Sequence, residues 1–454
     1  MAQKQKTVYR CSECGYLASK WMGRCPECGS WNTITEKTEI AAVSSGFIAE
    51  DEMTALPINE IENITYSRIV TGIPEFDRVL GGGIVPGSAI LVGGDPGIGK
   101  STLLLQMCRS IALDGKKILY VSGEESKEQI AMRAARLKVN NPDMLVLSAT
   151  DLDAILAVID KVDPGAVIID SIQTVNAADV ASSAGSMAQV KECALRIVRA
   201  TKRKGIAVFI VGHVNKEGSI AGPKILEHMV DAVLYFEGEK QLMYRVVRTI
   251  KNRFGTTSEI GVFEMSENGL KGVENPSLLF LSGRPEGVSG VSVACIMEGS
   301  RPILAEIQSL TSQTYFPSPR RVSSGVDYNK LCLILAVLEK RAGINTGQYD
   351  AYVNVAGGLK TDDPAADLAI AIAIASGMRD FIVPDEMIAI GEIGLAGEIR
   401  PVADINRRIK EGARIGFKIF MVSDKSRIEY ENSDINIIRV SDISQAVRIL
   451  SAAK

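Results

Sequence analysis

The chain has 454 residues, 46% of them hydrophobic and 23% charged, with a formal net charge of −3. This length predicts several domains, and the near-neutral charge excludes a surface that attracts nucleic acid over the whole molecule. No apolar run reaches the roughly 20 residues of a membrane helix, and the N-terminus lacks the apolar segment of a secretion signal. We therefore expect a cytoplasmic protein without a membrane partner, in which any contact with nucleic acid comes from a local patch.

Four of the eight cysteines form two C-x-x-C-G turns near the N-terminus: Cys11, Cys14, Cys25 and Cys28. Two such turns facing each other supply four thiolates, which make a closed tetrahedral site for structural Zn²⁺. A redox role is disfavoured, because the βαβ pattern of a thioredoxin is missing around these pairs. Residues 1–32 are therefore predicted to be a zinc ribbon whose folding depends on the metal.

A phosphate-binding loop is the next feature. Residues 33–64 are polar and acidic without periodicity, which is typical of a linker. Beyond them, GDPGIGKS matches G-x-x-x-x-G-K-[ST], between an apolar strand pattern at 89–92 and a helix pattern at 102–113. Glycines allow backbone N–H groups to point at phosphate oxygens, Lys100 supplies charge for the β- and γ-phosphates, and the Ser101 hydroxyl is a ligand for Mg²⁺. The predicted nucleotide-binding residues are Gly94, Asp95, Pro96, Gly97, Ile98, Gly99, Lys100, Ser101 and Thr102.

Strand and helix patterns alternate after this loop. Because such alternation produces right-handed crossovers, we predict an α/β domain with a parallel sheet over residues 65–270. The expected strands lie at 117–121, 144–147, 166–170 and 207–212, and the expected helices at 127–138, 151–161 and 186–204.

Polar residues stand where three of these strands end. Asp170 ends the strand at 166–170 and fits a Walker B aspartate that holds the Mg²⁺ shell through water, with a helix cap as the alternative. Glu124 and Glu125 follow another strand, and either could deprotonate the attacking water or complement a helix dipole. We favour Glu124 as the base, with Glu125 close behind. His213 follows the last strand and is either a sensor of the γ-phosphate or a packing residue.

Four segments together resemble the core of RecA-type ATPases: TGIPEFDRVLGGGIVPGS, GGDPGIGKST, YVSGEES and VIIDSIQT. The KNRFG segment at 251–255, combined with the zinc knuckles, more narrowly resembles the RadA (Sms) family of bacterial DNA repair proteins. This similarity covers essentially all 454 residues. The resemblance implies hydrolysis of ATP, a homo-oligomeric, hexameric ring, and single-stranded and branched DNA as partners. It also implies cooperation with the RecA recombinase.

The same resemblance implies that Lys251 and Arg253 project toward nucleotide or DNA at a subunit boundary. From the residues alone, 244–255 is a strand pattern that ends in cations on a Gly-bounded turn. Two uses of these cations remain open. They could stabilise the transition state of a neighbouring subunit, or form a hairpin tip that contacts DNA phosphates.

A change of composition after Gly272 predicts a further domain at 271–454, with an α+β fold. The stretches GGLKTDDPAADLAIAIAIASG and GEIGLAGEIRPVADINRRIKEG resemble the proteolytic domain of Lon protease. Ala365 stands where that family has its nucleophilic Ser and Asn406 where it has its Lys, so we expect no peptidase activity. Expected strands lie at 290–297, 303–310, 349–355 and 418–422, helices at 328–341, 364–376 and 405–415, and a hairpin-like segment at 387–402.

Together with the resemblance, these features favour a DNA-dependent ATPase that acts as a ring-shaped motor or helicase. The resemblance further implies that it promotes branch migration of recombination intermediates. Cation pairs at 320–321, 340–341 and 407–410 are candidates for a DNA surface or are ordinary solvated residues. One alternative is an ATP-dependent Lon-like protease, against which the missing Ser and Lys speak. The other is a nucleotide-switched scaffold with slow turnover.

Overall fold

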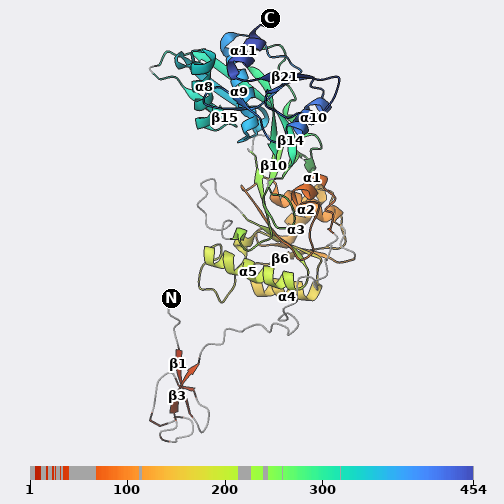
Figure 1. Cartoon of the computed structure of the whole chain (residues 1–454). Coiled ribbons are helices and arrows are strands. Elements are labelled where there is room, and N and C mark those ends of the chain that lie inside the picture. The colour runs from red at the N-terminus through yellow and green to blue at the C-terminus, as the bar shows by residue number, and fades with distance from the viewer. Residues whose placement is uncertain are drawn as a thin grey trace, which may run out of the picture. The chain divides into compact units, whose positions relative to one another are not determined.

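The structure is a computed structural model of the whole chain (Figure 1), and it divides into a small unit, Met1–Thr65, and a large unit, Tyr66–Lys454. The large unit is described over residues 68–111, 115–212, 226–238, 244–257, 259–316 and 318–452. In the small unit the description covers three strands and residues 23, 24, 26 and 31. The predicted zinc ligands Cys14, Cys25 and Cys28, the side chain of Cys11, and the predicted sensor His213 therefore lie outside the described residues.

The small unit contains a three-stranded antiparallel sheet in the order β2-β1-β3. Its strands are β1 Lys6–Cys11, β2 Leu17–Ala18 and β3 Ile34–Glu39. Because β3 pairs with β1 along its whole length, the predicted linker at 33–64 is too long at its start. ITEKTE is polar and has no turn signal, so only the pairing partner makes it a strand.

A nine-stranded sheet forms the centre of the nucleotide-binding part, in the order β12-β11-β10-β9-β4-β8-β7-β5-β6. The strands from β9 to β6 in this order are parallel, which confirms the predicted parallel sheet. The other three are antiparallel to their neighbours and extend the sheet beyond the predicted pattern. The bounds are β4 Ala89–Gly94, β5 Ile118–Ser122, β6 Met144–Ser148, β7 Ala166–Asp170, β8 Ala207–Val211, β9 Ala232–Glu237, β10 Tyr244–Asn252, β11 Ile260–Ser266 and β12 Gly269–Gly272.

Helices cover both faces of this sheet (Figure 1). They are α1 Pro74–Val79, α2 Lys100–Ser110, α3 Lys127–Arg136, α4 Leu152–Val162 and α5 Met187–Arg203, with a 3₁₀ turn η2 at Ile172–Thr174. Successive residues of a strand point to opposite faces, so Ile90 packs in the core under α1 to α3 and Leu91 in the core under α4 and α5. The expected helices are all present, and α3 begins where a Ser126–Gln129 capping box satisfies its first N–H groups.

The C-terminal part is built on a seven-stranded sheet in the order β15-β16-β14-β13-β17-β20-β21. Its strands are β13 Val291–Glu298, β14 Arg301–Gln313, β15 Arg321–Ser324, β16 Tyr349–Val355, β17 Met387–Ile390, β20 Ile419–Ser423 and β21 Asn436–Val440. Its helices are α7 Pro276–Phe280, α8 Tyr328–Ala342, α9 Asp367–Arg379, α10 Ile405–Ile415 and α11 Ile443–Ser451, with 3₁₀ turns η3 Thr346–Gln348, η4 Ala356–Gly358 and η5 Pro364–Ala366.

The prediction of a hairpin-like segment over 387–402 is wrong for most of its length. β17 instead lies inside the large sheet, parallel to β20, and only β18 Glu392–Ile393 and β19 Ile399–Arg400 form a hairpin. All four residues of β17 are buried. A central strand buried on both faces has no alternating pattern, so its neighbours cannot be inferred locally.

The nucleotide-binding and C-terminal parts share a hydrophobic core. Ile260 and Val262 of β11 belong to the same buried cluster as residues of α8 and α9. Two ion pairs of low exposure add to this contact: Arg248 with Glu298, and Arg301 with Glu75. The C-terminal part is thus packed directly against α1, β10 and β11 of the nucleotide-binding part.

Candidate functional site

The phosphate-binding loop connects β4 to α2 at the carboxyl edge of the parallel strands. Gly94 and Gly99 have φ angles of 141° and 117°, which favour glycine. A Cβ at Gly94 would also stand 2.9 Å from both Cβ and the carbonyl oxygen of Phe236. Helix α2 begins at Lys100, and Ser101 and Thr102 are half-buried in its first turn. The loop therefore ends at a helix N-terminus, which favours an anion.

The Lys100 side chain is buried and folds back on this loop. Its Nζ donates to the carbonyl oxygens of Gly94 at 2.7 Å and Asp95 at 3.0 Å. Burial lowers the pKa of Lys100 to about 8, although the charges of Asp170, Asp95 and Glu124 act in the opposite direction. A buried ammonium beside a glycine-lined anion cradle fits the phosphates of a nucleotide.

Asp170 ends β7, as predicted, and lies in register with Ser122 at the end of β5. Its Oδ2 accepts a hydrogen bond from the hydroxyl of Tyr120 at 2.5 Å. Arg133 Nη2 lies 3.9 Å from the same oxygen. Asp170 is also the largest charge that acts on the Lys100 pKa, so the structure brings the two predicted residues to one place. A carboxylate near this lysine fits the ligand shell of Mg²⁺.

The two glutamates after β5 have different partners. Glu124 Oε1 accepts from the Ser171 hydroxyl at 2.7 Å, directly beyond Asp170. Glu125 pairs with Arg133 at 2.6 Å, and its backbone N–H donates to Ser122 Oγ. Glu124, and not Glu125, contributes to the field at Lys100. The site therefore contains Glu124, whereas Glu125 is held at its margin.

Three residues of this site were not predicted: Tyr120, Arg133 and Ser171. Burial and the nearby Asp170 carboxylate raise the pKa of Tyr120 well above its usual value, so its hydroxyl stays a donor. A tyrosine inside an apolar strand indicates core packing. Only the pairing of β5 with β7 brings its hydroxyl to Asp170. Ser171 had a local signal, because it directly follows the predicted Walker B strand.

The KNRFG cations lie near the amino-terminal ends of the parallel strands, opposite the ends that carry the phosphate-binding loop. Lys251 Nζ donates to the carbonyl oxygens of Glu227 at 2.6 Å and Val230 at 2.8 Å. Arg253 pairs with the buried Asp231 at 3.1 Å. The other oxygen of Asp231 accepts from the backbone N–H of Ala89, the first residue of β4. The phosphate-binding loop follows the last residue of β4, roughly 16 Å away at the usual rise per residue. These cations therefore do not meet the phosphate site of their own chain.

The Lon-like site is filled by other contacts. Ala365 is fully buried in η5. Asn406 Oδ1 accepts from the backbone N–H groups of Glu429 at 2.8 Å and Tyr430 at 3.1 Å. Near both, Arg408 forms a buried pair with Asp363 at 2.7 Å. Arg408 was a candidate for a DNA surface at 407–410. Its burial removes it from that set, since its guanidinium bonds inside the fold.

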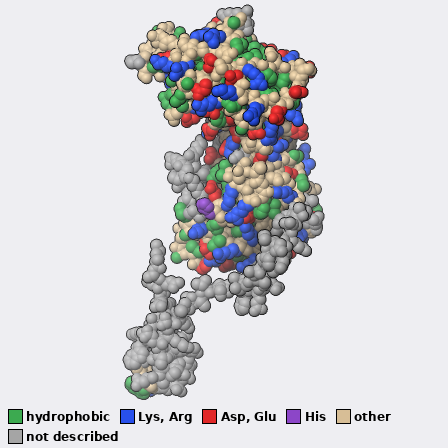
Figure 2. Space-filling model, in the orientation of Figure 1, with side chains coloured by type: hydrophobic (Ala, Val, Ile, Leu, Met, Phe, Trp, Pro, Cys, Tyr) green, Lys and Arg blue, Asp and Glu red, His purple; other side chains and the backbone are tan. Residues whose placement is uncertain are grey.

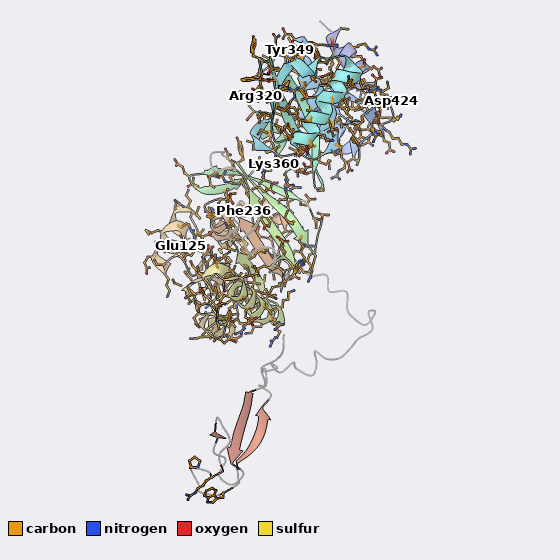
Figure 3. The ribbon with its side chains drawn as sticks, turned by 90° about the vertical axis from the view of Figure 1, so that its left-hand side faces the viewer. Glu125, Phe236, Arg320, Tyr349, Lys360 and Asp424 are labelled. Carbon is orange, nitrogen blue, oxygen red and sulfur yellow. The ribbon has the colours of Figure 1, made fainter. Side chains whose placement is uncertain are left out.

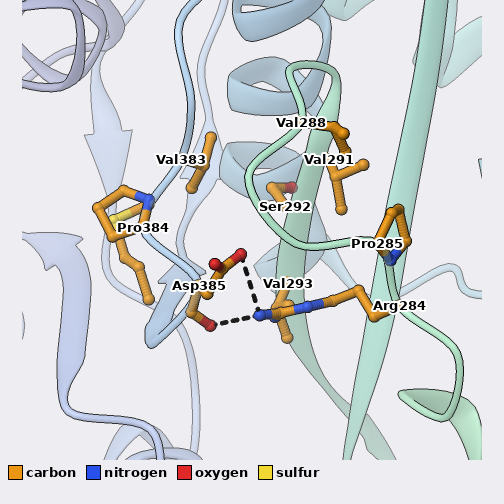
Figure 4. Close-up of a pocket in the computed structure, with 10 residues that line it drawn as sticks. Arg284, Pro285, Val288, Val291, Ser292, Val293, Val383, Pro384 and Asp385 are labelled. Carbon is orange, nitrogen blue, oxygen red and sulfur yellow. Dashed lines mark hydrogen bonds and ion pairs between the residues drawn. The ribbon is translucent and has the colours of Figure 1, made fainter. Parts of the chain in front are cut away.

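Other cations of the C-terminal part remain exposed. Arg320 stacks over the Phe316 ring at 4.3 Å, and Figure 3 places it near Tyr349 and well away from Phe236 and Glu125. On the face shown in Figure 2, basic and acidic side chains are interspersed. Arg284 and Asp385 pair with each other at 3.4 Å and line a small pocket (Figure 4), whose lining residues do not include the phosphate-binding loop. No described helix is long and apolar enough to cross a membrane.

Three family models match parts of the chain. Residues 57–219 match the AAA domain, residues 9–36 the rubredoxin metal binding domain, and residues 334–426 the subunit ChlI of Mg-chelatase. Together with the sheets described above, these matches confirm the predicted fold class: a zinc ribbon, a P-loop ATPase domain of RecA type and an α+β Lon-like domain.

Curated relatives match the chain over nearly its full length. The DNA repair protein RadA of Halalkalibacterium halodurans is 51% identical over 451 residues, covering 98% of this chain and 99% of the relative. The proteins of the same name from Listeria monocytogenes and Bacillus subtilis are 50% and 48% identical, each covering 98% of both chains. At this identity and coverage, all parts of the chain have counterparts in these relatives.

Proposed function

The chain belongs to the RadA family of bacterial DNA repair proteins, and from this membership we propose that it is a DNA-dependent ATPase that works as a ring-shaped motor. Its task would be branch migration of recombination intermediates. The observation that carries the proposal is that the phosphate site and the KNRFG cations lie at opposite ends of the parallel strands of one sheet. Such an arrangement suits a ring, in which each subunit completes the site of its neighbour.

The ATP site would use the residues at the end of β4, β5 and β7. Backbone N–H groups of the residues from Gly94 to Gly99, other than Pro96, would bind phosphate oxygens, and Lys100 would exchange its loop carbonyls for the β- and γ-phosphates. Ser101, and Asp170 through water, would hold Mg²⁺, which would supply positive charge for the phosphates. His213 would report the γ-phosphate. With these assignments, the negative charges of the phosphates would face the loop N–H groups, Lys100 and Mg²⁺.

Glu124 is the better candidate for the general base. The Ser171 hydroxyl orients its carboxylate beside Asp170, and it lies within the field of Lys100. Glu125 is instead paired with Arg133 at 2.6 Å and is not among the charges that act on Lys100. Glu124 would therefore orient the attacking water and take its proton.

Lys251 and Arg253 would act on a neighbouring subunit. Burial, and next the charge of Arg253, lower the pKa of Lys251, and both cations rest on internal acceptors in the single chain. A cation supplied in trans stabilises charge in the transition state and couples hydrolysis to ring geometry. Single-stranded and branched DNA would be the polymer moved, in cooperation with the RecA recombinase. The zinc ribbon, with Cys11, Cys14, Cys25 and Cys28 as ligands of Zn²⁺, is a candidate for that contact.

The test compares the chain with Lys100→Ala, Lys251→Ala and the matched surface variant Lys161→Ala. ATP turnover is measured with and without single-stranded DNA at low salt, and branch migration on a synthetic three-strand junction. We expect DNA to stimulate turnover, Lys100→Ala to abolish it, and Lys161→Ala to change nothing. Lys251→Ala should bind DNA but neither turn over nor migrate branches. A turnover rate that DNA leaves unchanged would contradict the proposal.

The two alternatives have their own readouts. ATP-dependent degradation of casein would support a Lon-like protease, which the buried Ala365 and the Arg408–Asp363 pair disfavour. Ring assembly and slow hydrolysis without any movement of DNA would favour a nucleotide-switched scaffold.

A further inference from the structure

Tyr120 and Asp170 lie on the same face of two neighbouring strands. In the parallel pair of β5 and β7, Tyr120 is opposite Ile168 and Ser122 is opposite Asp170. The tyrosine and the aspartate are therefore diagonal neighbours, a spacing that a long aromatic side chain can bridge. Tyr120 is completely buried in the core under α1 to α3, so its ring is held by packing.

The Tyr120 hydroxyl stands between an anion and a cation. It donates to Asp170 Oδ2 at 2.5 Å and accepts from Arg133 Nη2 at 3.3 Å. The same Nη2 lies 3.9 Å from Asp170 Oδ2, so the phenol makes the closer contact with both groups. Arg133 is in turn held by Glu125 at 2.6 Å. In this series of contacts, the buried Tyr120 hydroxyl fixes which atom donates to Asp170 and which atom accepts from Arg133.

We propose that Tyr120 is a positioning residue, which fixes the Asp170 carboxylate for the Mg²⁺ shell and holds Arg133 3.9 Å away from it, beyond hydrogen-bond distance. With Oδ2 engaged by the phenol, Oδ1 is the oxygen left for the metal shell. Partners behind a metal-binding carboxylate commonly set its orientation, and their loss weakens metal binding. The inference rests on the proposed role of Asp170.

Without the phenol oxygen, the Arg133 guanidinium, 3.9 Å from Asp170 Oδ2, can move closer to the carboxylate. A bidentate or close guanidinium–carboxylate pair would then form in the low-dielectric site. The metal would have to displace a fixed cation, so the loss should appear in metal-dependent binding and not in binding of the nucleotide alone. A purely structural tyrosine would change stability without this selectivity.

The experiment uses the full chain and its Tyr120→Phe variant, which removes one oxygen and keeps the buried ring. Affinity for a fluorescent ADP analogue is measured by titration, once with Mg²⁺ and once with EDTA. We expect affinity with Mg²⁺ to fall roughly tenfold or more and affinity with EDTA to stay unchanged. Electron paramagnetic resonance of Mn²⁺ bound with the nucleotide should show an altered metal environment.

Tyr235→Phe is the matched control, because this half-buried tyrosine packs against Gly93 of the phosphate-binding strand and not against Asp170. It should bind as the unmodified chain does under both conditions. The double variant Tyr120→Phe/Arg133→Gln should regain part of the Mg²⁺-dependent affinity, since the competing cation is gone. No regain would overturn the competition with Arg133.

Two results would overturn the positioning role itself. One is an unchanged Mg²⁺ effect in Tyr120→Phe, with or without a lower melting temperature. The other is an equal loss of affinity with Mg²⁺ and with EDTA, which indicates general damage to the site. Asp170→Asn separates this inference from the proposed function. If Asp170→Asn keeps the full Mg²⁺ effect, then Asp170 does not bind the metal shell, and the proposed function is wrong on this point independently of Tyr120.

Discussion

Arg301 of β14 donates through Nη1 to both carboxylate oxygens of Glu75 in α1, at 3.1 and 3.0 Å. Glu75 also accepts from the backbone N–H of Val262, so one carboxylate joins α1, β11 and β14. Both side chains have low exposure, 13% for Arg301 and 6% for Glu75. The helix that precedes the phosphate-binding strand is therefore tied to the C-terminal part through a buried charge.

Removal of one partner of this pair should be costly. Arg301→Met leaves the buried Glu75 with only the more exposed Arg78, 3.4 Å away, and we expect a loss of about 3 kcal/mol in the free energy of unfolding. The double variant Glu75→Gln/Arg301→Met should recover much of that loss. Arg414→Met is the control, because Arg414 is 55% exposed and solvent screens its pair with Glu411, which is worth about 1 kcal/mol or less. Urea unfolding measures all three, and equal effects of the two single variants would contradict the prediction.

A side chain at Gly123 should disturb catalysis more than binding. An added Cβ would stand 2.1 Å from Thr174 Oγ1, which itself donates to the Ser171 carbonyl. Ser171 orients Glu124, so Gly123→Ala should displace the proposed base and lower kcat on the order of 100-fold. Nucleotide affinity should change little.

Gly377→Ala in α9 is the matched control for this glycine substitution. Its Cβ would meet only ordinary contacts at 3.5 Å or more, and alanine is the better helix former. We expect a gain of about 0.5–1 kcal/mol in stability and unchanged turnover. Wild-type turnover in Gly123→Ala would contradict the placement of Glu124.

Nucleotide affinity should fall as pH rises through 8. Burial lowers the pKa of Lys100 to about 8 in the free protein. Phosphate oxygens favour the charged amine and raise this pKa, so the bound state holds more protons and binding takes up a proton near pH 8. Titration calorimetry in buffers of different ionisation enthalpy measures this uptake. Lys100→Ala should bind weakly with no uptake from this group. Affinity that is flat from pH 7 to 9 in the unmodified chain would refute the assignment.

The small unit should depend on metal. We expect about one Zn²⁺ per chain, bound by the four N-terminal cysteines. Chelation should remove hydrogen-exchange protection from β1 and β3 while β4 and β8 keep theirs, because the core of the large unit is separate. Cys28→Ser should lose the metal, and Cys332→Ser, at a free cysteine of the large unit, should retain it. A metal-free chain with protected β1 would speak against the ribbon.

Local patterns predicted much of the fold and of the site. The phosphate-binding loop needs glycines and a lysine at a set spacing, so Gly94 to Ser101 was recognisable from the sequence. Asp170 was placed correctly because an apolar run that ends in a carboxylate indicates the carboxyl edge of a parallel strand. The alternation of periods 2 and 3.6 predicted the helices and the six parallel strands except β9.

The sequence by itself thus determined the features that residues close together in the chain form, such as the phosphate-binding loop and the ends of strands and helices. Tertiary structure decided what depends on strand order. It placed β9 beside β4, the KNRFG cations away from the phosphate-binding loop, and β17 inside its sheet, and it buried Arg408. It also separated Glu124 from Glu125 and brought Tyr120 to Asp170 across β5 and β7. These contacts join residues about 50 positions apart, and no local period records them, because hydrogen bonds between strands set which side chains meet.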